Sequence, residues 1–220
     1  MSLLLKVKED HMAKIVAFKG VKKRASDNIL RKVPERPRNR DVRSREYLTP
    51  DEVDALMAAA VKVGRHRLRD RALILMTYRH GLRVSEVVDL KWDQIDLKAG
   101  RIHVNRLKNG SPATHYLEGD EMRVLRRVRR EYPDTPFVFS TERSGPLSRS
   151  TVNKLVGRAG KLAEIPFPVH PHMLRHACGF YLANNGIDTR TIQDYLGHKS
   201  IQHTVKYTQL TPHKFKGLWS

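Results

Sequence analysis

Three short segments of the chain carry side chains whose types and spacing suit chemistry at a phosphate. GLRVSEVVDL holds Arg83 and Glu86, RLKNG holds Lys108 at a turn, and the region 170–208 contains HPHMLRHACG, LGHKS and TVKYT. An arginine fork binds phosphate oxygens through parallel hydrogen bonds, and a tyrosine hydroxyl is an oxygen nucleophile. We interpret these segments as candidates for phosphate binding and for a nucleophilic step.

Each candidate also has an ordinary structural interpretation. Arg83 could cap a helix in solvent, and Glu86 could form a surface ion pair with it. Lys108 could be a simple turn lysine, and a lone helical tyrosine such as Tyr207 is more often a half-buried aromatic than a nucleophile. Taken one at a time, these residues favour the structural interpretation.

A metal site is a further alternative. His172 and His176 are four residues apart, so a helix would place both imidazoles on one face. The glutamate of an HExxH zinc site is missing, and the cation Arg175 stands between the two histidines. A metal hydrolase that uses His170, His172 and His176 therefore ranks last among the functions we consider.

Helix signals surround the first segment. Thr49, Pro50 and Glu52 match a capping box with proline in the first turn, which predicts a helix start. DRALILMTYRH (70–80) predicts a second helix that ends at Gly81. SEVVDL (85–90) predicts a short third helix capped by its serine, Ser85.

The pattern then changes from helical to alternating. IDLKAGRIHVNRLKNG alternates around Ile102 and Val104, with turn residues at 98–100 and 109–110, and ATHYLEG follows as a third strand. Helical patterns resume over 119–131, 148–163, 171–185, 188–196 and about 200–208. The sequence therefore predicts a mainly α fold with a small antiparallel β-sheet (α+β).

The charge of the chain favours a polyanionic partner. Among 220 residues, 42 Lys and Arg face 23 Asp and Glu, a formal net charge of +19. Residues 1–46 hold 14 Lys and Arg against 6 Asp and Glu, and 33–46 reads as an extended basic linker. We interpret 1–46 as a basic arm, with a short helix over 9–19, that either tracks DNA or serves solubility.

Composition excludes several other classes of protein. No apolar run approaches the about 18 residues that span a membrane, and the N-terminus lacks the apolar region of a secretory signal. The single cysteine, Cys178, excludes an internal disulfide and a cysteine-rich zinc module. We expect a cytoplasmic protein, associated with the bacterial nucleoid and not with membranes.

Together the segments resemble the tyrosine recombinase (phage integrase) family over roughly residues 46–210. GLRVSE resembles its first arginine box, RLKNG its hairpin lysine, HMLRH its His-x-x-Arg box, LGH its second histidine and TVKY its nucleophile. The short N-terminal part, with YRHGLR and IQDYLGH, is most similar to the fimbrial phase-variation invertases, which lack a full N-terminal clamp domain. The long basic arm departs from the shortest of these invertases.

The resemblance implies a tyrosine recombinase catalytic-domain fold over 47–212 and a role for each motif residue. Arg83 and Arg175 would bind the two non-bridging phosphate oxygens, and Tyr207 would form a 3′-phosphotyrosine. Lys108 would protonate the departing 5′-oxygen. His172 would serve as a base or proton shuttle, His198 would hydrogen-bond the phosphate, and Glu86 would orient the arginine and histidine groups.

The resemblance also implies partners. The substrate would be double-stranded DNA with recombination sites, cut by a homotetramer on synapsed DNA, with DNA-bending accessory proteins left open. No cofactor and no metal are expected, because two arginines supply the positive charge at the phosphate. The apolar tail 213–220, KFKGLWS from 214, would dock on a neighbouring protomer or fold back on its own domain.

Two further functions stay open at this point. A type IB topoisomerase-like enzyme would use the same arginine, lysine, histidine and tyrosine chemistry to relax one duplex without strand exchange. A DNA-binding regulator would keep the scaffold without the chemistry, although all the candidate catalytic positions hold competent residues. The sequence leaves DNA inversion, integration and excision equally open.

Overall fold

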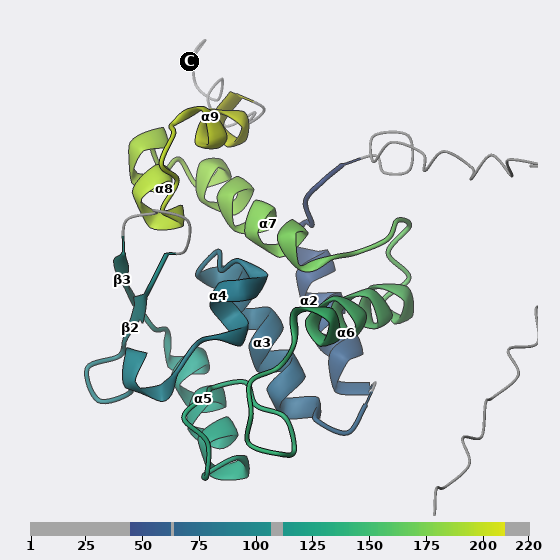
Figure 1. Ribbon diagram of the computed structural model, residues 1–220. Coiled ribbons are helices and arrows are strands. Elements are labelled where there is room, and N and C mark those ends of the chain that lie inside the picture. The colour runs from purple at the N-terminus through teal and green to yellow at the C-terminus, as the bar shows by residue number, and fades with distance from the viewer. Residues whose placement is uncertain (1–44, 63, 107–111, 210–220) are drawn as a thin grey trace, which may run out of the picture. The chain divides into compact units, whose positions relative to one another are not determined.

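The computed structural model describes residues 45–62, 64–106 and 112–209. In the described chain, one group of helices comes first, a small sheet follows, and a second group of helices completes the fold (Figure 1). In chain order they are α2 (Pro50–Lys62), α3 (Arg67–Arg79), α4 (Val84–Val88), the 3-10 turn η1 (Trp92–Gln94), β1 (Ile95–Asp96), β2 (Arg101–Val104), β3 (Ala113–Tyr116), α5 (Gly119–Glu131), α6 (Arg149–Leu162), α7 (Pro171–Asn184), α8 (Thr189–Leu196) and α9 (Gln202–Gln209). The predicted mainly α class with a small antiparallel sheet is confirmed.

The predicted capping box opens α2. The Glu52 carboxylate accepts the backbone N–H of Thr49 at 2.9 Å, and the Thr49 hydroxyl accepts the backbone N–H of Glu52 at 3.3 Å. Arg45 donates to the same carboxylate at 2.7 Å. The start of the described chain is thereby attached to the first turn of α2.

The α3–α4 junction carries one confirmed prediction and one correction. Gly81 follows α3 with φ +54°, a left-handed conformation that glycine tolerates best. The prediction that Ser85 caps α4 is wrong, because α4 starts at Val84 and Ser85 lies inside it. The Glu86 carboxylate instead accepts the backbone N–H of Arg83 at 2.9 Å, so a side chain of the site caps the helix.

The sheet has the order β1-β2-β3 and is antiparallel throughout. Ile102 pairs with His115, and Val104 pairs with Ala113. Ile102 and Val104 are buried while their neighbours along β2 are exposed, as the alternation predicts. One face of β2 therefore packs on the core, and Asn105 and Arg106 follow the strand before residues 107–111, which include Lys108.

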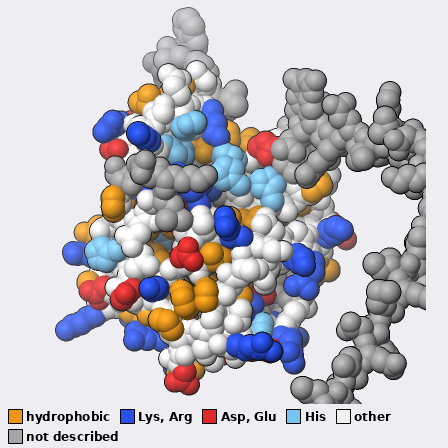
Figure 2. Space-filling model, viewed as in Figure 1, with side chains coloured by type: hydrophobic (Ala, Val, Ile, Leu, Met, Phe, Trp, Pro, Cys, Tyr) orange, Lys and Arg blue, Asp and Glu red, His pale blue; other side chains and the backbone are white. Residues whose placement is uncertain are grey.

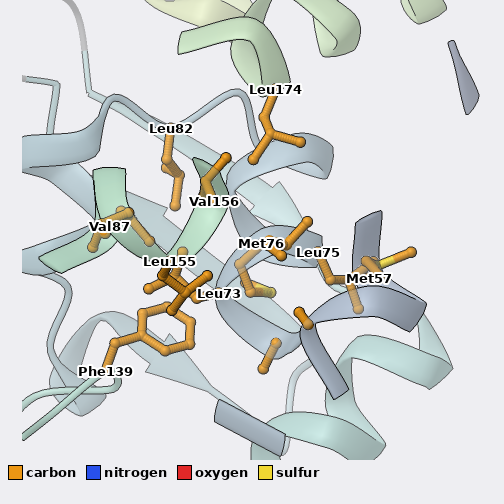
Figure 3. Packing of buried hydrophobic residues seen from close by; sticks show 14 of the residues in the cluster. Met57, Leu73, Leu75, Met76, Leu82, Val87, Phe139, Leu155, Val156 and Leu174 are labelled. Carbon is orange, nitrogen blue, oxygen red and sulfur yellow. The ribbon is translucent and has the colours of Figure 1, made fainter. Parts of the chain in front are cut away.

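α3 forms the centre of the main hydrophobic core and packs against α2, α5 and α7. Leu73 and Met76 from α3 belong to this core together with Leu155 and Val156 from α6 (Figure 3). A second, smaller cluster joins α7, α8 and α9 through Cys178, Leu196 and Tyr207. Because α7 belongs to both clusters, it connects the main core to the C-terminal helices.

Among the described residues, no helix is long and apolar enough to cross a membrane.

Candidate active site

Arg83 and Glu86 form a close pair at the start of α4. Arg83 Nη1 donates to Glu86 Oε1 at 2.6 Å, and the Glu86 side chain is almost fully buried while that of Arg83 is 23% exposed. Burial alone would raise the pKa of Glu86, but the Arg83 N–H and the nearby guanidinium groups outweigh it and lower this pKa. Glu86 therefore stays ionised and holds Arg83 in place.

Arg175 is buried on α7, and its guanidinium points toward the ends of two other helices. Its guanidinium donates to the carbonyl of Gly81, and Nη2 donates to the carbonyl of Leu196 at 2.7 Å. Burial, followed by the charges of Arg83 and Arg106, lowers the pKa of Arg175 to about 10. Arg175 is thus still a cation at neutral pH, and it joins α7 to the ends of α3 and α8.

Tyr207 lies on α9 with its ring packed against α7. The hydroxyl is 2.8 Å from His176 Nδ1, and the ring meets Phe180 edge-on with centroids 5.1 Å apart. A Cβ on Gly179 would lie 2.6 Å from the Tyr207 ring, so the absence of a side chain there gives the ring its space. Burial raises the pKa of Tyr207, which keeps the phenol protonated in this conformation.

Two histidines of α7 line this part of the site. The rings of His172 and His176 meet edge-on with centroids 4.3 Å apart. Desolvation, then the charge of Arg175, lowers the pKa of His172 to about 4, although His172 still reaches solvent. Desolvation, then His172 and Lys206, lowers the pKa of His176 to about 2. Both rings are therefore neutral at pH 7 and can accept a hydrogen bond.

His198 follows the left-handed Gly197 that ends α8. Its Nδ1 lies 2.8 Å from the Thr204 hydroxyl, and its ring is nearly parallel to that of Tyr207 with centroids 6.2 Å apart. Desolvation, then Arg175 and Arg83, lowers its pKa to about 3. The predicted second histidine therefore lies beside the predicted nucleophile.

Electrostatic coupling shows that these side chains gather at one place. The charge of Arg83 acts on the pKa of His172, Arg175, His198 and Tyr207. In Figure 2, pale blue histidines gather on the upper part of the visible face, where α7 and α9 lie in Figure 1. An excess of arginine over carboxylate at such a place suits an anion with two free oxygens.

The sequence interpretation missed two residues of this site. His176 enters the sequence analysis only as part of a metal site, yet its Nδ1 lies 2.8 Å from the Tyr207 hydroxyl. Arg106 received no role, yet its buried guanidinium bonds to Glu86 Oε2 at 3.0 Å. The i, i+4 spacing of the histidines is a usable signal for His176. Arg106 begins the RLKNG segment, but nothing local indicates its distant partners.

Within the described residues, no three His, Cys, Asp or Glu side chains are grouped so that they could hold a metal ion. His170, the third residue of the metal alternative, instead lies 3.5 Å from the Glu46 carboxylate.

Comparisons with known proteins agree with this arrangement of side chains. The phage integrase family model matches residues 46–214. The chain belongs to the phage integrase family. Type 1 fimbriae regulatory protein FimE of Escherichia coli K12 is 46% identical over 181 residues, which cover 80% of this chain and 91% of FimE. FimB of the same strain is 43% identical over 184 residues, or 81% of this chain and 92% of FimB.

The fold of this phage integrase family member is also that of solved recombinases. The crystal structure of XerA recombinase aligns with a TM-score of 0.67 at 29% identity, over 77% of this chain and 62% of that chain. The predicted fold and enzyme class are therefore confirmed: the protein is a tyrosine site-specific recombinase, a DNA strand-transferring enzyme.

Three predictions for this tyrosine recombinase concern residues outside those that the structure describes. They are the position of Lys108 in the loop between β2 and β3, the arm 1–46 apart from Arg45 and Glu46, and the tail 213–220.

Proposed function

We propose that this recombinase cuts and rejoins DNA through a phosphotyrosine on Tyr207, and that its reaction inverts a DNA segment. The observation that carries the proposal is the convergence of Arg83, Arg175, His198 and Tyr207, which come from separate motifs and interact electrostatically. The similarity to FimE and FimB over most of their length supports a short invertase-type enzyme.

We assign phosphate binding to Arg83 and Arg175. A phosphodiester is an anion that repels nucleophiles, so attack requires neutralisation of its two non-bridging oxygens. Arg83 has 23% of its side chain exposed and is steadied by Glu86, while Arg175 is buried and fixed by backbone carbonyls. Together they bind one oxygen each, and His198 donates a further hydrogen bond to the phosphate.

Proton transfer accompanies the attack. The Tyr207 oxygen bonds to phosphorus, its proton passes to a neutral histidine, and the bond from phosphorus to the 5′-oxygen breaks. His172 and His176 are both neutral at pH 7, and His176 already contacts the hydroxyl. We assign the base to this histidine pair, with His172 as the shuttle, and the protonation of the 5′-oxygen to Lys108.

Rejoining is the reverse of cleavage. A free 5′-hydroxyl attacks the phosphotyrosine and gives its proton to Lys108. The bond from phosphorus to the Tyr207 oxygen breaks, and the histidine pair returns its proton to Tyr207, which restores the phosphodiester and the free enzyme. The phosphotyrosine preserves the energy of the broken bond, so the reaction requires no nucleotide. The proposal assigns no cofactor and no metal ion, because the arginines supply the charge.

The number of strand cleavages sets the number of protomers that we propose for the assembly. Two duplexes are each cut on two strands, so four protomers act together on synapsed DNA. The tail 213–220 is our candidate for docking between protomers, and the arm 1–46 is our candidate for additional contacts to DNA. We place the reaction on the bacterial nucleoid in the cytoplasm, with DNA-bending accessory proteins as further partners.

A nicked suicide substrate and an inversion assay test the proposal. The nicked DNA should trap a covalent complex with the wild-type protein in the presence of excess EDTA. A plasmid with inverted sites should then exchange the segment between them. Relaxation without exchange would favour a topoisomerase-like enzyme, binding without any covalent complex would favour a regulator, and excision or integration alone would overturn the assignment of inversion.

A further inference from the structure

Arg106 is fully buried just before the loop that links β2 to β3. Its side chain is 0% exposed, and its guanidinium meets Glu86 Oε2 at 3.0 Å. It also donates to the carbonyls of His80 at 3.0 Å, Gly81 at 3.3 Å and Tyr195. A buried cation is costly unless it is paired, so these acceptors fix where the group can lie.

The contacts of Arg106 connect three separate segments. His80 and Gly81 follow α3, Glu86 lies in α4, and Tyr195 is near the end of α8. The turn after α8 also packs closely against the aliphatic part of the Arg106 side chain, since a Cβ on Gly197 would lie 2.6 Å from Arg106 Cγ. Arg106 thus lies where the motifs of Arg83, Arg175 and His198 come together.

Both phosphate-binding arginines share an acceptor with Arg106. Glu86 directs Oε1 to Arg83 and Oε2 to Arg106. The carbonyl of Gly81 accepts from both Arg175 and Arg106. A shift of the Arg106 guanidinium would therefore move the partner that holds each of the other two arginines.

We propose that Arg106 is a positioning residue that sets the placement of Arg83 relative to Arg175 for phosphate binding, without touching DNA itself. Its guanidinium donates to Glu86 and to the backbone carbonyls of His80, Gly81 and Tyr195, and its side chain is 0% exposed, so its bonds lie within the protein in this conformation. The inference rests on the proposed phosphate-binding roles of Arg83 and Arg175. It assigns a function to a residue outside the catalytic set.

Arg69 provides a matched control. It is also a buried arginine, it pairs with Asp70 at 2.7 Å, and it donates to the carbonyl of Ser140 at 2.7 Å. None of these partners belongs to the candidate active site. Arg69→Met therefore removes a buried, hydrogen-bonded guanidinium without disturbing Arg83 or Arg175.

The test measures three quantities for Arg106→Met and Arg69→Met in the full chain: melting temperature, affinity for site DNA, and single-turnover cleavage of saturating nicked DNA at a temperature where each variant is folded. We expect both variants to have a lower melting temperature than wild type and an affinity for site DNA within threefold of that of wild type. Cleavage should fall about 100-fold in Arg106→Met and less than threefold in Arg69→Met, since misplacing a positioned group is costly. Equal cleavage rates in the two variants would overturn the proposal.

A double variant separates positioning from stability. Arg106→Met leaves the Glu86 carboxylate with less compensation, and adding Glu86→Gln removes that buried charge. The pair Arg106→Met with Glu86→Gln should regain melting temperature but stay about 100-fold slow. It should also cleave more slowly than Glu86→Gln alone, because the single variant keeps Arg106 on the Gly81 carbonyl that Arg175 shares. Recovery of cleavage together with melting temperature would show that Arg106 serves only the fold. Absence of cleavage by wild type would instead count against the proposed function.

Discussion

The hydroxyl of Tyr207 lies 2.8 Å from Nδ1 of His176, and the pair connects α9 to α7. His176 has its pKa lowered to about 2, so its neutral ring can accept the hydrogen bond. The same contact holds Tyr207 with 1% of its surface exposed. The nucleophile must therefore leave this buried position, or the site must open around it, before it meets a phosphate.

Gly179→Ala should disturb the packing of the Tyr207 ring against α7 and destabilise the protein. A Cβ there would lie 2.6 Å from the ring, and such overpacking costs about 1–3 kcal/mol. The expected result is a lower melting temperature, measured by circular dichroism. Gly157→Ala in α6 is the control: its Cβ would lie 3.7 Å from the Val169 carbonyl oxygen, an ordinary contact, and it should be neutral or stabilising by up to about 1 kcal/mol. Equal melting temperatures would contradict the packing argument.

Acidification should destabilise the protein. Buried neutral histidines have lowered pKa values, to about 3 for His115 and His198 and about 2 for His176. In the unfolded chain these histidines bind protons near pH 6.5. Their contribution to the free energy of unfolding is therefore complete above that pH and decreases as the pH drops toward 4. Each histidine contributes at most about 1.4 kcal/mol per pH unit, less where its ring is part exposed.

Thermal melts between pH 7.5 and pH 4 measure this dependence. His176→Asn can still accept a hydrogen bond from Tyr207 but does not titrate, so its melting temperature should fall less steeply than that of wild type. The exposed His103→Asn is the control and should follow wild type. A His176→Asn curve parallel to wild type would contradict the neutral buried imidazole.

Local signals in the sequence predict much of this fold. The capping box at Thr49, the glycine stop at Gly81 and the alternation around Ile102 depend on neighbours within a few residues. The prediction of Ser85 as a cap is wrong because a serine before an apolar run has the same local pattern as a true cap. A carboxylate from inside the helix, Glu86, takes that role.

The family motifs predict which residues of the candidate site converge, but not how the site is held together. Arg106 bonds to Glu86 and to carbonyls just after α3 and in α8, and these partners are 20 to 89 residues away in the chain. His176 meets Tyr207 across 31 residues. Such contacts depend on tertiary packing, and spacing in a single sequence contains no record of them.

Lys108→Ala should slow cleavage of ordinary DNA by about 10²–10⁴-fold, the usual contribution of a general acid. A 5′-bridging phosphorothiolate at the scissile position should restore the rate, because a thiolate leaves without protonation. Single-turnover gels measure both substrates. Lys98→Ala, in the turn between β1 and β2, is the matched control and should cleave both like wild type. Failure of the phosphorothiolate to rescue Lys108→Ala would make Lys108 a simple DNA contact.

Deletion of residues 1–44 tests the basic arm. If the arm tracks phosphates, binding to specific and random duplexes should weaken by similar factors, and the slope of log affinity against log salt should decrease by about 0.9 for each phosphate that the arm neutralises in the full chain. Cleavage of bound DNA should change little, since the candidate catalytic residues lie beyond the arm. A larger loss of affinity for the specific duplex than for the random duplex would indicate that the arm recognises the minor groove of the site. An unchanged slope would indicate that the arm does not bind DNA and serves only solubility.

Covalent trapping on a nicked suicide substrate tests the assignment of Tyr207 as the nucleophile most directly. Wild type should form an adduct that survives denaturing electrophoresis, and Tyr207→Phe should form none while binding DNA with unchanged affinity, because the basic surface remains. Tyr195→Phe and Tyr181→Phe are the controls and should still form the adduct. Formation of an adduct by Tyr207→Phe would contradict the assignment. Loss of the adduct in one of the two control variants would also contradict it.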